Sequence, residues 1–134
     1  MSFSSDFSIP VRIYIEDTDA GGIVYYVNYL KYMERARTEL LRDKGFLKPA
    51  VMEEGLLLVV ASANINYRQS ARLDDELQVS ADIVKVARTY IVFDQRIFRG
   101  EECLTTAEIK IACVKRDTMR PAVLPPRVVK LLDS

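Results

Sequence analysis

Histidine is absent from the 134 residues, and this absence excludes several kinds of catalysis. A chain without imidazole forms neither a serine–histidine–aspartate triad nor a histidine-ligated metal site. It also has no imidazole base for hydratase or dehydratase chemistry. Any acid–base step must therefore use carboxylates, tyrosines, lysines or backbone amides.

Cysteine and net charge are also scarce. Cys103 and Cys113 lack the C-x-x-C spacing of a metal or redox site, and we expect both thiols to be buried or half-buried. Nineteen basic and nineteen acidic residues cancel, so the chain lacks the net positive charge expected of a protein that binds nucleic acid or an anionic membrane. The chain has no apolar run of membrane-spanning length and no secretory signal in its first ten residues. We expect a cytoplasmic protein that binds no nucleic acid and has no integral membrane association.

Hydrophobic periodicity predicts one long helix among several strands. Apolar residues recur at helical spacing over residues 27–44, with Asn28 as a possible N-cap and Gly45 after the last turn. A short helix is expected within 125–132. Strands are predicted at residues 11–16, 56–67, 77–83, 90–98 and 104–115, the last three as an antiparallel meander.

These elements predict a single α+β domain over residues 1–134. The helix has a broad apolar face, and a sheet of about five strands is the only layer that can cover it. A curved antiparallel sheet wrapped around one long central helix is the hotdog fold. Such a sheet leaves an open edge, which a second copy of a small subunit commonly covers, so we expect a homo-oligomer.

The first strand is joined to the helix by a run of acidic and small residues, Asp17-Thr18-Asp19-Ala20-Gly21-Gly22. The run places a carboxylate near a helix N-terminus, where unpaired N–H groups and partial positive charge can bind a developing oxyanion. A carboxylate beside an oxyanion-binding site is the smallest set of catalytic groups that can hydrolyse an activated acyl group. The same residue types are ordinary turn formers, so composition alone favours a simple strand-to-helix connection.

Two other interpretations of this run fit poorly. Asp17, Asp19 and Gly22 match positions one, three and six of a calcium-binding EF-hand loop, but position twelve is Asn28 instead of glutamate. The adjacent glycines are not followed by the lysine and hydroxyl residue of a phosphate-binding loop. The sequence therefore predicts no metal site here.

A family resemblance is carried by residues 11–39, with the core Glu16-Asp17-Thr18-Asp19-Ala20-Gly21-Gly22-Ile23-Val24-Tyr25-Tyr26. This stretch closely resembles the YbgC and 4-hydroxybenzoyl-CoA thioesterase family, and similarity at 68–76 and 106–126 extends the match over nearly the whole chain. The resemblance implies a hotdog fold, a homodimer or homotetramer, and hydrolysis of an acyl-CoA thioester without a metal or other cofactor.

The resemblance also implies roles for two residues. Asp19 corresponds to the family's catalytic carboxylate, which acts as a nucleophile or as a general base on water. Tyr26 takes the position whose backbone N–H polarises the thioester carbonyl. The YbgC branch usually has a tyrosine at the position of Ile15 and a histidine at that of Tyr26, while tyrosine at Tyr26 resembles the 4-hydroxybenzoyl branch. A mechanism that uses a histidine side chain is therefore in doubt, and so is the preferred acyl group.

Three further residues are candidates for the acyl pocket. Glu34 matches a helix position where the 4-hydroxybenzoyl branch has a carboxylate facing the pocket, and an ion pair with Arg37 or with a neighbouring strand is the alternative. Tyr25 and Tyr29 either line the pocket or pack against the sheet, and packing is favoured.

Two basic residues are candidates for binding CoA. Lys85 and Arg88, expected in the turn between two strands, resemble basic residues that meet the phosphates of CoA in the 4-hydroxybenzoyl branch. Solvated turn charges are the alternative.

Two other functions are compatible with the sequence. One is a catalytically weak acyl-CoA-binding or scaffold protein, because family members are linked to the cell-envelope Tol-Pal machinery and to lipid synthesis. The other is hydrolysis of acyl-carrier-protein thioesters, which differs from the first expectation only in the carrier.

Overall fold

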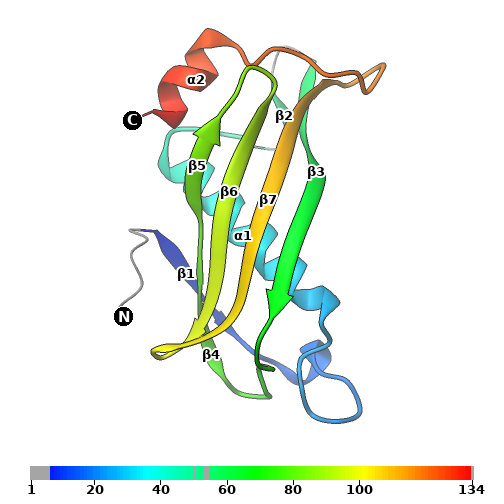
Figure 1. Cartoon of the computed structure of the whole chain (residues 1–134), viewed down its shortest axis with the longest axis vertical. Helices are drawn as coiled ribbons and strands as arrows, with labels where there is room; N and C mark the ends of the chain where they lie inside the picture. The colour runs from blue at the N-terminus through cyan, green and yellow to red at the C-terminus, as the bar shows by residue number, and fades with distance from the viewer. Residues whose placement is uncertain (1–6, 50, 53–54, 134) are drawn as a thin grey trace.

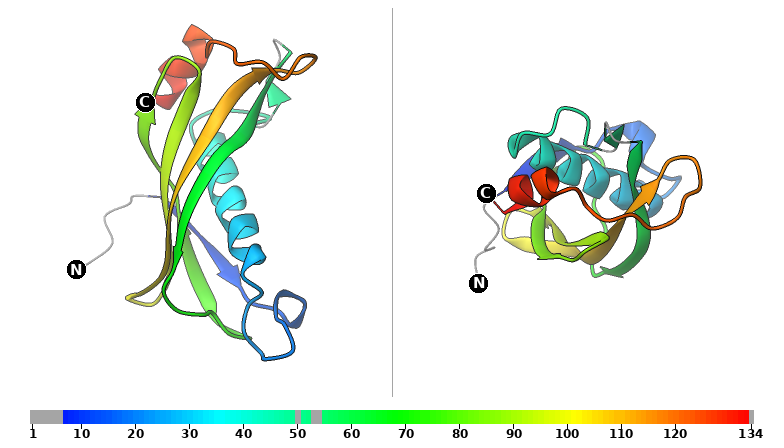
Figure 2. Two further views of the ribbon diagram at one scale, coloured as in Figure 1. Left: turned by 45° about the vertical axis from the view of Figure 1, so that its right-hand side comes forward. Right: turned by 90° about the horizontal axis from the view of Figure 1, so that it is seen from above.

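A computed structural model describes residues 7–49, 51–52 and 55–133. One curved sheet wraps around a long helix, and a short helix lies at one end of the sheet (Figures 1 and 2). The elements follow one another as β1 (Ser8–Arg12), the 3-10 turn η1 (Ile15–Asp17), α1 (Val27–Asp43), β2 (Val51–Met52), β3 (Leu56–Tyr67), β4 (Glu76–Ser80), β5 (Asp82–Val86), β6 (Tyr90–Arg99), β7 (Glu102–Lys115) and α2 (Pro126–Leu132).

The described strands form one antiparallel sheet in the order β1-β4-β6-β7-β3-β2. The remaining strand, β5, also pairs with β6, along an earlier part of β6 than β4 does. The meander predicted at the end of the chain is confirmed, as is the predicted hotdog fold. The sheet has seven strands, not about five, because β2 is a two-residue strand and one predicted strand is divided.

The prediction of a single strand over residues 77–83 is wrong. The chain forms β4 and then β5, with a break at Ala81, whose N–H donates to the carbonyl oxygen of Phe7 at 3.2 Å. Both strands pair with β6, but β4 also pairs with β1 on its other side. Side-chain alternation continues across the break, and therefore the sequence pattern did not reveal this change of partner.

The first strand is shorter than the alternation predicted. It ends at Arg12, because the backbone of Ile13 bonds instead to Asp74 and Asp75 just before β4, at 3.0 and 2.9 Å. The 3-10 turn then begins at Ile15. Ile13 is completely buried, whereas Ile15 is 76% exposed, so the prediction of a strand that continues to residue 16 is wrong.

The long helix agrees with the prediction except at its start. It ends at Asp43, and Gly45 follows it with a φ of +108°, a conformation that glycine adopts without strain. Asn28 is not the N-cap, since the helix begins one residue earlier. Instead Asn28 is buried in the first turn, where its side-chain amide donates to the carbonyl oxygen of Asp17 at 2.9 Å.

The core lies between α1 and the concave face of the sheet. Cys113 is buried and Cys103 half-buried, as expected. Among the described residues, neither helix has the length and apolar character needed to cross a membrane. The largest fully buried side chains include Tyr32 and Met33 of α1 with Leu77, Val79, Ile91, Phe93, Ile97, Leu104 and Ile109 of the sheet.

Replacing Ile13 by alanine tests whether its burial holds the segment between β1 and η1. We expect Ile13→Ala to lower the free energy of unfolding by about 2–5 kcal/mol, because it leaves a cavity in the core. Chemical denaturation monitored by circular dichroism measures the change. Ile15→Ala, two residues along, is the control and should shift stability by about 0.5 kcal/mol or less. Equal losses in the two variants would contradict this description of the segment.

Candidate active site

The segment 14–26 lies at one end of the sheet, beside the start of α1 (Figure 1). Its first part is a 3-10 turn held by local hydrogen bonds. The carboxylate of Asp17 accepts the N–H of Tyr14 at 2.8 Å, and the hydroxyl of Thr18 donates to the carbonyl oxygen of Ile15 at 2.8 Å. The carboxylate of Asp17 therefore has a structural role in closing the turn.

A tight hairpin follows and carries Asp19. Thr18 and Val24 face each other as a β-bridge, and the N–H of Asp19 donates to Ile23 at 3.0 Å. Gly22 turns the chain with a φ of +79°, in the left-handed region that favours glycine. The hairpin therefore fixes Asp19 on the exposed side of the segment.

The two aspartates of the motif differ in what their oxygens contact. Oδ1 of Asp19 accepts the N–H of Gly21 at 2.8 Å, while Oδ2 accepts no hydrogen bond from any described residue. An ideal Cβ built at Gly21 would stand 3.3 Å from Oδ1, so a small residue is favoured there. Asp19, unlike Asp17, thus presents an exposed carboxylate oxygen that is available to a ligand or to water.

The hairpin leads directly into the N-terminus of α1. Tyr26 is the N-cap residue, and no side chain caps this end of the helix. Within the part of the chain that the structure describes, the N–H of Tyr26 donates to no acceptor. The start of the helix therefore offers an unpaired donor and the positive end of the helix dipole a few residues after Asp19 in the chain.

The tyrosines around the helix start fall into exposed and buried sets. Tyr25 and Tyr26 are about half exposed, and their ring centroids lie 5.2 Å apart. Tyr29 is buried, and its hydroxyl accepts the N–H of Ala71 at 2.9 Å. Tyr29 therefore packs in the core, as the favoured interpretation predicted, whereas Tyr25 stays accessible beside the hairpin.

Tyr32 lies one turn further along α1 and close to Asp17. Its buried hydroxyl makes no hydrogen bond of acceptable geometry to the described residues. Burial, followed by the neighbouring negative charge of Asp17, raises the pKa of Tyr32 well above its ordinary value. The phenol therefore stays neutral and is no candidate for a base.

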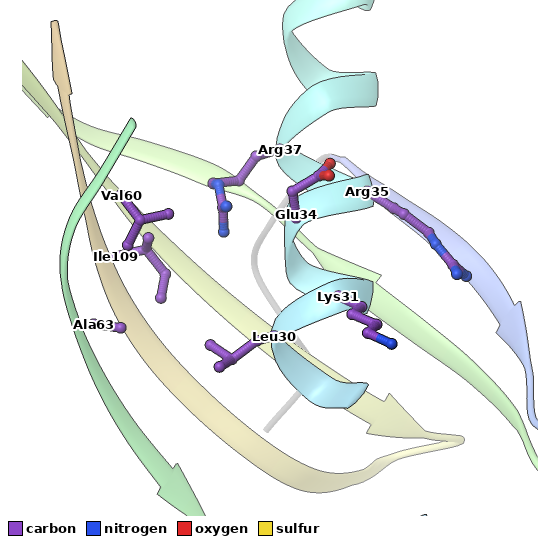
Figure 3. Close-up of a pocket in the computed structure, with 8 residues that line it drawn as sticks. All are labelled: Leu30, Lys31, Glu34, Arg35, Arg37, Val60, Ala63 and Ile109. Carbon is purple, nitrogen blue, oxygen red and sulfur yellow. The ribbon is translucent and has the colours of Figure 1, made fainter. Parts of the chain in front are cut away.

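A groove of about 600 Å³ runs between α1 and the strands β3 and β7. The residues that line it are Leu30, Lys31, Glu34, Arg35, Arg37, Val60, Ala63 and Ile109 (Figure 3). Glu34 is exposed at its rim and accepts the hydroxyl of Thr38 at 2.8 Å. The alternative interpretation of Glu34 is wrong, because no ion pair within 4.0 Å joins it to Arg37 or to a strand among the described residues.

Arg37, which lines this groove, and its partner Gln95 were not recognised as site candidates from the sequence. Arg37 is buried, and its Nη1 donates to Oε1 of Gln95, a completely buried residue of β6, at 3.0 Å. The signal was present in the pattern: Arg37 interrupts an apolar stripe of the helix, and Gln95 occupies an inward position between Phe93 and Ile97.

The structure does not bring Lys85 and Arg88 near Asp19 within one chain. Lys85 lies on β5, not in the turn as predicted, and only Arg88 belongs to the β5–β6 turn. This turn is at the opposite end of the sheet from segment 14–26 (Figures 1 and 2). The Nζ of Lys85 and that of Lys110 lie 5.3 and 4.1 Å from the ring centroid of Tyr90.

Metal-binding geometry is absent from the described residues, where no group of three or more histidine, cysteine, aspartate or glutamate side chains converges.

Comparison with known families decides the class of the protein. Residues 13–132 match the thioesterase-like superfamily. The chain belongs to this superfamily. The acyl-CoA thioesterase YbgC of Haemophilus influenzae is 45% identical over 123 residues, which cover 91% of this chain and 90% of that protein. The acyl-CoA thioester hydrolase YbgC of Escherichia coli is 44% identical over 124 residues, or 92% of each chain.

Solved structures of thioesterases share the fold. A probable thioesterase from Bartonella henselae is 34% identical and superimposes with a TM-score of 0.80, covering 91% of this chain and 100% of that one. A DHNA-CoA thioesterase from Staphylococcus aureus is 27% identical with a TM-score of 0.87, covering 95% and 88% of the two chains. The family resemblance and the prediction of a thioester hydrolase are confirmed.

The hydrogen bond between Tyr29 and Ala71 holds the start of α1 against the chain before β4. We expect Tyr29→Phe to lower the free energy of unfolding by about 1–3 kcal/mol, because the buried N–H of Ala71 loses its acceptor. Urea denaturation measures the loss. Tyr67→Phe removes a hydroxyl from a half-exposed neighbouring ring and should change stability by about 0.5 kcal/mol or less. A loss of the same size for Tyr67→Phe would contradict the assigned role of the hydroxyl.

Proposed function

We propose that this protein hydrolyses acyl-CoA thioesters to a free acid and CoA in the cytoplasm, with Asp19 and the backbone N–H of Tyr26 at the reaction centre. One observation supports the assignment above the others. The hairpin that exposes a carboxylate oxygen of Asp19 leads within a few residues to an unpaired N–H at a helix N-terminus. Relatives 44 and 45% identical are acyl-CoA thioesterases, which supports the substrate class.

The chemistry follows from these two groups. The thioester carbonyl oxygen accepts the N–H of Tyr26, so the negative charge that develops on it is stabilised by a fixed donor and by the helix dipole. Asp19 then acts in one of two ways. As a nucleophile it attacks the carbonyl carbon, expels the CoA thiolate and forms an anhydride that water hydrolyses. As a general base it takes a proton from the water that attacks. Neither route requires a metal or another cofactor.

A homodimer completes this proposal. The outer edge of β3 is paired with β2 only at Leu56 and Leu57, and residues 58–67 have no strand on that side in the described chain. The side chains from Val60 to Asn64 are exposed. A second copy that adds its own β3 antiparallel to this edge would continue the sheet and protect it.

The same pairing explains the separation of the basic residues from Asp19. An antiparallel β3–β3 contact reverses the long axis of the second copy, so the β5–β6 turn of one chain comes to the end of the sheet that carries segment 14–26 of the other. Lys85 and Arg88 would then serve the phosphates of CoA bound at the neighbouring chain's site. Tyr25 and Glu34 would contact the substrate on the chain that carries Asp19.

Removing the charge of Asp19 tests the catalytic assignment. We expect Asp19→Asn to leave the fold intact and to lower kcat on acyl-CoA by about a hundredfold or more, because the amide neither attacks nor accepts the proton. Turnover is measured as free thiol release on short, long and aromatic acyl-CoA substrates. Asp43→Asn, an exposed change at the far end of α1, should keep the wild-type rate.

Three other results of the turnover assay would contradict parts of this proposal. Wild-type turnover in Asp19→Asn would refute the role of Asp19. Binding of acyl-CoA by the wild-type protein without turnover of any substrate would indicate a scaffold or binding protein instead. Faster release from acyl-carrier-protein thioesters than from CoA esters would identify a different carrier.

Light scattering tests the dimer. We expect the wild-type protein to have at least twice the 15.3-kDa chain mass, and four times that mass would show that dimers pair further. Ser62→Lys places a positive charge at the exposed edge of β3. In a two-fold pairing of this edge the charge lies close to the same charge of the second copy, so the repulsion should shift the mass toward the monomer. Val84→Lys on β5, also exposed, is the matched control and should leave the mass unchanged. A monomeric wild-type protein would refute the dimer.

A further inference from the structure

The groove between α1 and β3 contains a buried cation. Arg37 is only 7% exposed, yet it lines the groove of about 600 Å³ and also a smaller extension of about 170 Å³ beside Leu41 and Phe93. Its side chain points from the helix toward the wall formed by Val60 and Ile109 (Figure 3). The guanidinium therefore faces the groove and is not turned to bulk solvent.

Arg37 is held in place by a neutral partner. Its Nη1 donates to Oε1 of Gln95, and the Nε2 of Gln95 donates to the carbonyl oxygens of Met33 and Ser80 at 2.9 and 3.1 Å. All the polar atoms of the Gln95 side chain are thus used. The network fixes the guanidinium between α1 and the sheet, which restricts its rotamers and presents its other donors to the groove.

The remaining donors of Arg37 have no partner among the described residues. No carboxylate lies within 4.0 Å of the guanidinium, although the more distant charge of Glu34 acts on it. The Nε and Nη2 atoms make no hydrogen bond, and neither is sealed from the groove. A cation removed from water without a counter-charge is costly unless a ligand or water supplies acceptors.

The groove has an apolar part, beside the exposed charged residues Lys31, Glu34 and Arg35. Leu30, Val60, Ala63 and Ile109 form the part of the groove that begins one turn after the N-terminus of α1. Arg37 lies ten residues beyond Val27, which is about 15 Å along a helix axis. The actual span is shorter because side chains on a helix lean toward its N-terminus. An acyl group whose thioester lies at the N-terminus of α1 would therefore end near the guanidinium if it is a medium-length chain or an aromatic ring.

From this arrangement we propose that the groove binds the acyl group, and that Arg37 selects acyl groups with a hydrogen-bond-accepting oxygen at the end remote from the thioester. The oxygen is that of a terminal hydroxyl or carboxylate, which accepts from the free N–H groups of Arg37. This inference rests on the proposed thioesterase function and identifies its substrate class. The apolar residues of the groove hold the body of the acyl group, and Arg37, the buried one of its cations, recognises its end.

Matched substrate pairs test the selection with the unmodified protein. Hexanoyl-CoA is compared with its terminally hydroxylated and terminally carboxylated counterparts, and benzoyl-CoA with para-hydroxybenzoyl-CoA. We expect at least one oxygen-bearing substrate to exceed its apolar counterpart in kcat/KM by about tenfold or more, as a hydrogen bond to a charged group allows. A comparison of the hydroxylated with the carboxylated substrates shows which of the two groups Arg37 prefers.

Arg37→Met tests the residue. Methionine keeps an unbranched side chain but has no donors, so the ratio of kcat/KM within the preferred pair should fall toward one while the apolar substrate is still hydrolysed. Arg42→Met, an exposed change on the same helix, should keep the wild-type ratio. If Arg37→Met does not fold, Arg37→Lys replaces it. Lysine keeps the charge but loses the planar set of donors, and the ratio should then fall by about threefold or more.

The outcomes separate this inference from the proposed function. Hydrolysis of apolar acyl-CoA as efficient as that of every oxygen-bearing partner refutes the selection and leaves the thioesterase intact. A preference that survives in Arg37→Met or Arg37→Lys refutes the role of Arg37. Absence of turnover on every thioester refutes the proposed function and this inference with it.

Discussion

The carbonyl oxygen of Asp17 is the point on which the geometry of the site depends. It accepts the backbone N–H of Tyr25 at 3.0 Å and the side-chain amide of Asn28 at 2.9 Å, and so joins the end of the 3-10 turn to the first turn of α1. The hairpin that carries Asp19 lies between the residues that these two hydrogen bonds join. Because both hydrogen bonds involve fixed backbone or a buried side chain, the carboxylate and the helix N-terminus are positioned before any ligand binds.

A second set of contacts ties the same region to the sheet. Val24 donates its N–H to the carbonyl oxygen of Ala71 at 2.9 Å, and the N–H of Ala71 donates to the hydroxyl of Tyr29. The chain before β4 therefore supports both the hairpin and the helix. The motif keeps its shape because the hairpin and the adjacent start of α1 both bond to Ala71, which is remote in the sequence.

The burial of Arg37 shows how the fold accommodates a polar group in its core. Replacing a buried, partnered polar group by an apolar one often leaves a protein as stable or more stable, so stability alone does not explain an arginine here. Gln95 satisfies one donor and uses its own amide on Met33 and Ser80. What remains is a buried, fixed cation beside the apolar part of the groove, an arrangement suited to recognition more than to stability.

Local pattern in the sequence determined the long helix, the strands β3, β6 and β7, the hotdog fold and, through resemblance, the family and the candidate Asp19. These features depend on side-chain periodicity and on a contiguous motif. Tertiary structure alone decided the rest: the early end of β1, the exposure of Ile15, the break at Ala81 and the place of Asn28 inside the helix. Ile15 lies in a 3-10 turn held by local hydrogen bonds, and Asn28 bonds to the carbonyl oxygen of Asp17. The end of β1 and the break at Ala81 depend on hydrogen bonds between segments remote in sequence. The partner of Arg37 was hidden for the same reason, since Gln95 lies 58 residues away and only the packing of α1 on β6 brings the two together.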